Sequence, residues 1–264
     1  MSSSPRKPSK SVPGRVGLAV AVTVILIAGV QGMRSLSTYR ANLLARLDLG
    51  RNGPPPAPEN PVPSADPAKS ALIFVGDSRI ASWPTAPSLD DAHIINLGRH
   101  GETTAQLLAR LDTDIIGREP RMVVLQTGIN DLKAMGAFRS RSNEIAENCW
   151  ANLRQIIDGL RASNIPVVVL TIFPVGDLHP LRYPIWSNDT LSAVADINQR
   201  LRSLDEPGVM VFDCDPVFSD GGRMRAEFIV DDFHINPAAY QALSAQLNPF
   251  LRDALERGRD SAEL

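Results

Sequence analysis

From residue 71 onward, the chain contains short, mostly apolar runs that are followed by glycine or by polar residues. Their side chains are apolar in succession rather than in alternation, which is typical of strands buried on both faces of a parallel sheet. We therefore predict five parallel strands, at residues 71–75, 93–97, 122–126, 167–170 and 209–212.

Segments with apolar residues at helical spacing separate these strands. The clearest runs from Glu144 to Ala162, and the last begins at Asn236-Pro237, a capping residue followed by proline at the first helical position. The predicted helices cover residues 104–111, 144–162, 191–204 and 237–256. This alternation predicts a doubly wound, five-stranded α/β domain. Ligands of such sheets bind beyond the carboxyl ends of the strands, so we expect the chemistry there.

The first seventy residues follow a different pattern. Basic residues precede an uncharged, mostly apolar run at 16–33, between Arg15 and Arg34. Its eighteen residues are at the lower limit for a helix that spans a bilayer. We predict a single transmembrane signal-anchor with a cytoplasmic N-terminus. A cleaved signal peptide is the alternative, and either interpretation exports the remainder to the periplasm or the extracellular space.

The segment after the apolar run connects it to the folded domain. Ser35 to Leu49 can form a short amphipathic helix at the membrane surface, and residues 53–69 hold seven prolines, which favour an extended spacer. The predicted organisation is a basic cytoplasmic tail at 1–15, the transmembrane helix at 16–33, a juxtamembrane segment and proline-rich linker at 34–69, and one globular domain at 70–264.

Composition and charge exclude several classes of protein. The 264 residues are 44% hydrophobic, which excludes a disordered chain. There are two cysteines, Cys149 and Cys214, too few for a disulfide scaffold, and we expect both to be buried free thiols. Residues 1–53 carry eight Lys/Arg and one acidic residue, whereas the remainder is acidic and the whole chain has a net charge of −2. This distribution indicates a targeting segment rather than a nucleic-acid-binding face.

Polar residues that can carry chemistry follow three strands and precede the last helix. They form four groups: Gly76-Asp77-Ser78, Gly98-Arg99-His100-Gly101-Glu102-Thr103, Gly128-Ile129-Asn130-Asp131, and Asp231-Asp232-Phe233-His234. Each group alone is a common turn or cap. Their occurrence together, at positions that meet along one edge of the predicted sheet, indicates a shared site.

These residue types suit the hydrolysis of an ester. Ser78 can act as the nucleophile and His234 as its base. Asp231 lies three residues before His234, so one turn could bring its carboxylate back to the imidazole. The backbone amide of Gly101 and the side-chain amide of Asn130 could stabilise the oxyanion.

At these residues the sequence resembles the SGNH hydrolases, also called the GDSL esterase/lipase family, over residues 70–250. The resemblance implies a flavodoxin-like three-layer fold and ester hydrolysis without a cofactor or a metal. It also implies an oxyanion hole made by the amides of Ser78 and Gly101 and the side chain of Asn130. The expected partner is an ester of a small molecule, a glycan or a lipid, and no nucleic acid is expected.

Two features depart from the pattern or extend it. Arg79 stands where the family often has leucine or isoleucine, and it could be a cation at the pocket rim or an ordinary surface residue. The stretch from Gly176 to Asn188, with His179, Tyr183 and Trp186, could be a substrate lid or an ordinary loop.

Other enzyme classes fit the sequence less well. The Gly-x-Ser-x-Gly elbow of α/β-hydrolases is absent, because Ile80 stands at the second glycine. No glycine-rich nucleotide loop follows a strand. The four histidines lack the spacing of metal ligands: His93, His100, His179 and His234.

Two alternatives to a hydrolase remain open. One is an O-acyltransferase in which a hydroxyl of a cell-envelope glycan replaces water, and the other is a non-catalytic binding module on the same fold. The sequence leaves the acyl group and the alcohol of the substrate open.

Overall fold

The computed structural model describes residues 13–47, 71–83, 89, 93–176, 188–220, 222–231 and 233–260. The side chains of residues 13–27 and 258–260 are outside this description. The chain divides into two compact units, Met1–Leu44 and Ala45–Leu264.

Helix α1 (Pro13–Leu47) is continuous, and it includes most of the segment predicted as a separate amphipathic helix at 35–49. Among the described residues, no helix is both long and apolar enough to cross a membrane. The predicted span at 16–33 includes residues 16–27, whose side chains lie outside the described part, and the predicted linker at 53–69 lies wholly outside it. The anchor and the linker therefore stay predictions.

The second unit is built on a five-stranded parallel sheet, as the sequence predicted. Its strands are β1 (Ala71–Gly76), β2 (His93–Asn96), β3 (Met122–Gln126), β4 (Val167–Leu170) and β5 (Val209–Phe212). Their order is β2-β1-β3-β4-β5, and every neighbouring pair is parallel. The chain leaves β1 toward β2 on one side and returns to β3 on the other. The carboxyl end of β1 is therefore the topological switch point, where doubly wound sheets form their ligand crevice.

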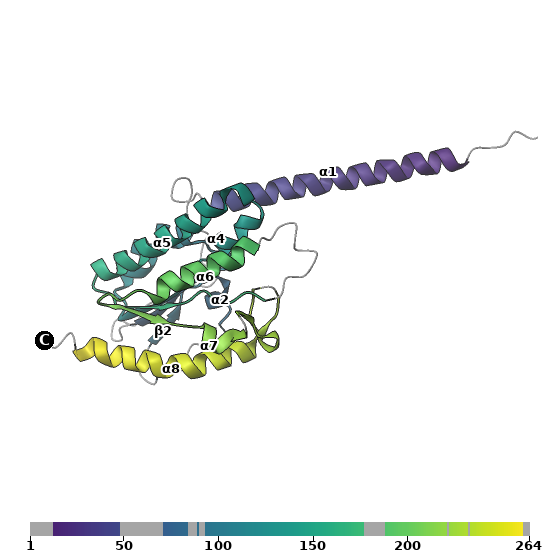
Figure 1. Ribbon diagram of the computed structural model, residues 1–264. Coiled ribbons are helices and arrows are strands. Elements are labelled where there is room, and N and C mark those ends of the chain that lie inside the picture. Colours follow the sequence, from purple (N-terminus) through teal and green to yellow (C-terminus); the bar gives the residue numbers. More distant parts are fainter. Residues whose placement is uncertain are drawn as a thin grey trace, which may run out of the picture. The chain divides into compact units, whose positions relative to one another are not determined.

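Helices cover both faces of the sheet and make three layers (Figure 1). Helices α5 (Ser142–Ala162) and α6 (Asn188–Arg202) lie on one face, and α8 (Pro237–Asp260) lies on the other. The shorter helices are α2 (Ser78–Ala81), α3 (Thr104–Ala109), α4 (Ile129–Leu132) and α7 (Asp215–Phe218). Three of these four begin within three residues of a strand end, at β1, β3 and β5, so they carry the residues of the strand ends.

The remaining elements are short. A π turn (Leu111–Ile115) and a 3₁₀ turn (Ile116–Arg118) follow α3, which therefore ends two residues earlier than predicted. Further 3₁₀ turns cover Lys133–Gly136, Arg139–Arg141 and Ala226–Phe228, and β6 (Ser219–Asp220) pairs antiparallel with β7 (Arg223–Met224).

Burial follows the apolar pattern of the sequence. Strands β1, β3 and β4 are buried along their whole length, as expected for strands covered on both faces. The predicted stripe of α5 is buried at Ile145, Cys149, Leu153, Ile156, Ile157 and Leu160. Cys149 and Cys214 are free and buried, which confirms their expected state.

Candidate active site

The nucleophile turn begins where β1 ends. Gly76 has φ +156°, and a Cβ atom there would lie 1.7 Å from the carbonyl oxygen of Gln126, so only glycine fits. Asp77 then caps α2, because its carboxylate accepts a hydrogen bond from the amide of Arg79 at 2.9 Å. Ser78 is consequently the first residue of α2, immediately beyond the carboxyl end of β1.

Ser78, His234 and Asp231 form one hydrogen-bonded chain. Ser78 Oγ lies 3.0 Å from His234 Nε2, and His234 Nδ1 lies 2.8 Å from Asp231 Oδ2. The other carboxylate oxygen of Asp231 accepts the amides of Phe233, at 3.0 Å, and of His234, at 2.9 Å. This turn is the reason that a spacing of three residues returns the carboxylate to the imidazole, as the sequence suggested.

The electrostatics of the pair suit a general base. Burial alone would raise the pKa of Asp231, but hydrogen bonds from the His234 ring and from two amides outweigh it and hold this pKa below its ordinary value. An ionised Asp231 accepts from Nδ1–H, which selects the tautomer whose Nε2 can accept the Ser78 proton. Ser78 is 4% exposed, whereas the side chains of Asp231 and His234 are each 35% exposed.

The three predicted oxyanion donors lie at the same edge of the sheet, after β1, β2 and β3. Gly101 has φ +70°, which suits glycine, and the Asn130 side chain donates to the carbonyl of Glu102 at 2.9 Å. This bond leaves the second N–H of the Asn130 amide for another acceptor. In the described part of the structure, the amides of Ser78 and Gly101 donate to no protein group. Three donors at this edge are therefore free to bind an acceptor other than the protein.

Buried carboxylates hold the loop that carries Gly101. Glu102 forms a two-pronged ion pair with Arg110, at 2.7 and 2.6 Å, and both side chains are at most 1% exposed. Asp131 accepts from the amide of Thr104 at 2.9 Å and from its hydroxyl at 2.6 Å. Burial raises the pKa of Asp131 to about 6, although the hydrogen bonds from Thr104 act in the opposite direction.

Arg79 occupies neither of the two places considered for it. It is 0% exposed, so it is neither a cation at the pocket rim nor a surface residue. Nε donates to the carbonyl of Phe233 at 2.9 Å, Nη1 donates to the carbonyl of Phe173 at 3.1 Å, and the guanidinium lies 5.2 Å from the centre of the Phe173 ring. Ser78, Arg79 and Ile80, three of the four residues of α2, are all buried.

Sequence reasoning missed Lys133, which lies one helical turn after Asn130. Its ammonium group lies 5.0 Å from the centre of the Phe233 ring, and this ring packs against the His234 ring with 4.4 Å between centres. Burial lowers the pKa of Lys133, and the nearby Arg46 and Arg79 act in the same direction. Its helical spacing from Asn130 is the only sequence signal that could have placed it here.

The remaining histidines do not form a metal site in the described part of the chain. No group of three or more His, Cys, Asp or Glu side chains there could hold a metal ion. His93 lies on β2 and His100 is exposed in the next loop. His179 and residues 177–187 of the stretch from Gly176 to Asn188, considered as a lid or an ordinary loop, lie outside the described residues.

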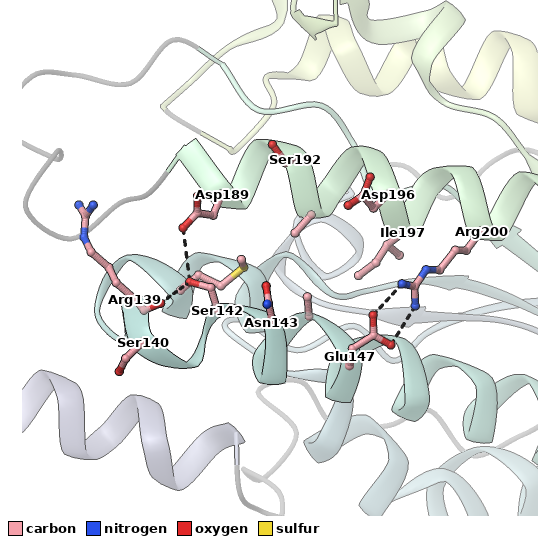
Figure 2. A pocket seen from close by; sticks show the side chains of 13 residues that line it. Arg139, Ser140, Ser142, Asn143, Glu147, Asp189, Ser192, Asp196, Ile197 and Arg200 are labelled. Atoms are coloured by element: carbon pink, nitrogen blue, oxygen red, sulfur yellow. Dashed lines mark hydrogen bonds and ion pairs between the residues drawn. The ribbon is translucent and has the colours of Figure 1, made fainter.

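A pocket of about 460 Å³ lies between α5 and α6 (Figure 2). Polar residues line most of it, among them Ser142, Asp189 and the ion pair between Glu147 and Arg200. None of Ser78, Asp231 and His234 contributes to its wall. The hydrogen-bonded chain therefore lies outside the lining of this pocket.

Solved structures share this fold. A GDSL-like lipase from Bacteroides thetaiotaomicron has a TM-score of 0.57 and 19% sequence identity, over 74% of this chain and 92% of its own. A Bacteroides fragilis protein with a provisional description as an acylhydrolase has a TM-score of 0.60 at 19% identity, over the same shares. The acetyl xylan esterase AlAXEase has a TM-score of 0.53 at 18% identity, over 67% of this chain and 97% of its own. No curated protein sequence matches the chain.

A family model decides the assignment. The model of the GDSL-like lipase/acylhydrolase family matches residues 74–242, which run from β1 through the His234 loop into α8. This range contains every residue of the hydrogen-bonded chain and all three oxyanion donors. The chain therefore belongs to the GDSL-like lipase/acylhydrolase family, and it is a hydrolase that acts on ester bonds.

Proposed function

We propose that the protein cleaves carboxylic esters through a catalytic triad of Ser78, His234 and Asp231. The observation that carries this proposal is the hydrogen-bonded chain from Ser78 Oγ through both ring nitrogens of His234 to the Asp231 carboxylate. At 3.0 Å from Ser78 Oγ, His234 Nε2 can take the proton of the hydroxyl. At 2.8 Å from Asp231 Oδ2, His234 Nδ1 can donate to the carboxylate that orients the ring.

The reaction has two halves. His234 Nε2 takes the proton of Ser78 Oγ as this oxygen attacks the acyl carbon, and the carbonyl oxygen becomes an oxyanion. The amides of Ser78 and Gly101 and the side chain of Asn130 stabilise it. His234 returns the proton to the leaving alkoxide, and an acyl-enzyme remains on Ser78. In the second half, His234 takes a proton from water as its oxygen attacks the acyl carbon; the bond between the acyl carbon and Ser78 Oγ then breaks, His234 returns the proton to Oγ, and the acid is released.

A variant at Ser78 tests this mechanism directly. Ser78→Ala removes the nucleophile, so turnover of 4-nitrophenyl acetate should fall by about four orders of magnitude or more in folded protein. A fluorophosphonate should label the wild type at Ser78 and leave the variant unlabelled. Labelling of another serine, or substantial turnover by the variant, would contradict the assignment.

We propose short acyl esters, above all O-acetyl esters of glycans, as the substrate class, with lysophospholipids as the next candidate. The supporting likeness is to AlAXEase, an acetyl xylan esterase at 18% identity. A panel of 4-nitrophenyl esters with increasing acyl length, together with acetylated xylan and a lysophospholipid, tests this order. A maximum at long acyl chains would favour the lipid substrate.

A second candidate is O-acyl transfer to a glycan hydroxyl. It is favoured by the exposure of the base, since 35% of the His234 side chain faces solvent and an acceptor larger than water could approach it. The transferase requires an acylated glycan to form at the expense of free acid when acceptor is added. A hydrolase releases the same amount of acid with or without the acceptor.

We also propose that residues 16–33 anchor the protein, with the catalytic domain in the periplasm or the extracellular space. The support is the basic N-terminus followed by the apolar run. Carbonate-washed membranes should retain the full-length chain, and protease added outside should digest the domain. A shortened chain in the soluble fraction, with a new N-terminus after the apolar run, would indicate cleavage of a signal peptide instead.

A further inference from the structure

Arg79 joins the nucleophile to the base by a second route besides the catalytic hydrogen bond. Ser78 and Arg79 are consecutive, and so are Phe233 and His234. Ser78 Oγ meets His234 Nε2 at 3.0 Å, while Arg79 Nε donates to the carbonyl of Phe233 at 2.9 Å. The pair Ser78–Arg79 is thus linked to the pair Phe233–His234 by two hydrogen bonds, between residues that are 154 to 156 positions apart in the sequence.

The same peptide group is held at its other end. The carbonyl of Phe233 and the amide of His234 belong to one planar peptide. The carbonyl accepts from Arg79, and the amide donates to Asp231 Oδ1 at 2.9 Å. A plane that is held at both ends cannot rotate freely, so the direction in which the His234 side chain leaves the backbone is restricted.

The energetic cost of Arg79 indicates that it is more than packing. Asp77 and Asp231 favour its charge at longer range, but among the described residues no carboxylate lies within ion-pair distance of the fully buried guanidinium, and Nη2 has no hydrogen-bond partner. A buried charge without a paired charge and a buried donor without an acceptor both destabilise a fold. An aliphatic side chain of similar volume would avoid both costs. An aliphatic residue could not, however, donate hydrogen bonds to the carbonyls of Phe233 and Phe173.

We propose that Arg79 is a positioning residue that sets His234 against Ser78, by fixing the Phe233–His234 peptide to the nucleophile turn and to the end of β4. This inference rests on the triad proposed above and adds to it a residue that touches neither substrate nor reacting atoms. Its second bond, to the carbonyl of Phe173 just beyond β4, ties the loop that carries His234 to the end of the sheet.

The test compares Arg79→Met and Arg79→Lys with a matched control, Tyr240→Phe. Tyr240 donates its hydroxyl to the carbonyl of Arg79 at 2.8 Å, so its change removes a buried hydrogen bond from the same turn but leaves the guanidinium bonds intact. In R79M, kcat for 4-nitrophenyl acetate should fall about 10- to 100-fold with little change in KM, because the base is displaced while the binding surface is kept. R79K, which keeps a donor, should recover part of the loss. Y240F should lower the urea midpoint but keep kcat within about two-fold.

A spectroscopic signature separates positioning from stability. The Nδ1 proton of His234, bonded to Asp231, should give a downfield proton resonance that persists in the wild type and Y240F. It should broaden or vanish in R79M. Wild-type kcat and an unchanged resonance in folded R79M would overturn the proposal, and so would an equal loss of kcat in Y240F. If R79M does not fold, Arg79→Gln decides by the same criteria, because it is neutral and reaches at most one carbonyl.

The outcome is distinguishable from a failure of the triad itself. If Ser78→Ala retained activity, the proposed mechanism would fall whatever the behaviour of Arg79. If Ser78→Ala is inactive and Arg79→Met turns over like the wild type, the triad stands and only the positioning role is lost.

Discussion

The two sides of the candidate site are built differently. The nucleophile and the oxyanion donors lie on turns that follow strands of the parallel sheet, and Ser78 and Asn130 are at most 4% exposed. The base lies on the loop 229–235, outside the main sheet and closed by a single antiparallel bridge between Ile229 and Ile235. The side chains of Asp231 and His234 on this loop are about one-third exposed. The sheet thus positions the nucleophile and the oxyanion donors directly, whereas the position of the base depends on hydrogen bonds made by side chains.

Each side has its own buried arginine, and the two are bonded differently. Arg110, on the oxyanion side, pairs with the Glu102 carboxylate and also donates to the carbonyl of Leu97 at 2.8 Å. In the described part of the chain, Arg79, on the histidine side, bonds two carbonyl groups and packs on an aromatic ring, while Asp77 acts on its charge from beyond ion-pair distance. The bonds of Arg110 join residues of one region, between β2 and the turn after α3, whereas those of Arg79 join the loop that carries His234 to the turn that carries Ser78. We therefore expect substitutions in the Arg110 ion pair to lower mainly the stability of the fold, and substitutions of Arg79 to lower mainly kcat.

The largest effect is expected for the pair that makes up the histidine side. His234→Ala and Asp231→Asn should each lower kcat by about 10⁴-fold, because the first removes the base and the second leaves it in the wrong tautomer. Since the two residues share one task, the double variant should lose little more than His234→Ala alone. Steady-state kinetics on protein shown by circular dichroism to be folded provides the measurement. Fully additive losses would mean that the two residues act independently.

On the oxyanion side, breaking the buried ion pair should mainly destabilise the fold. Glu102→Gln leaves the buried Arg110 charge with only a longer ion pair, to the part-exposed Asp114 at 3.8 Å, so the free energy of unfolding in urea should fall by up to about 3–5 kcal/mol. The matched control is Glu147→Gln, which breaks an ion pair with Arg200 in which the Glu147 side chain is 61% exposed. This control should change stability by less than about 1 kcal/mol. Equal losses in the two variants would show that burial does not set the strength of the pair.

The next effect is a pH dependence that belongs to Asp131. Its pKa is about 6 in the folded protein against an ordinary value of 3.8, so the folded state binds more protons than the unfolded state between these pH values. The free energy of unfolding therefore falls as pH rises through this window, by up to about 3 kcal/mol. Asp131→Asn cannot ionise, so its stability relative to wild type should improve by this amount between pH 4 and pH 7. A difference independent of pH, measured by urea unfolding, would contradict the raised pKa.

The smallest effect is expected at the junction between the histidine loop and α8. Asn236 accepts from the amide of Ala239 at 3.0 Å and donates to the carbonyl of Glu227 at 2.6 Å. Asn236→Ala removes this cap and should lower the free energy of unfolding by about 1 kcal/mol. If the loop depends more on Arg79 than on this junction, kcat should change less than in Arg79→Met. A larger loss of kcat in Asn236→Ala would reverse that order.

Sequence reasoning was most successful where structure is local. All five strands, and the last helix from Pro237, were predicted because apolar runs and a capping signal are readable in neighbouring residues. The helix after β2 was predicted too long, since the π turn at Leu111–Ile115 leaves no simple sequence signal. The grouping of Ser78, Gly101, Asn130 and His234 could also be anticipated, because parallel strands present their carboxyl ends at one edge.

The sequence by itself determined the layer architecture, the strand-end motifs and the turn that returns Asp231 to His234. These follow from short-range rules of burial, capping and hydrogen bonding, which act between residues close in the chain. Only the tertiary structure decided that Arg79 points inward, that Glu102 meets Arg110 in the interior, and that the Ser78–Arg79 and Phe233–His234 pairs face each other. Such contacts depend on the direction of each side chain once the sheet has formed. No local pattern encodes that direction, because the partner is either distant in sequence or chosen by the space that packing leaves.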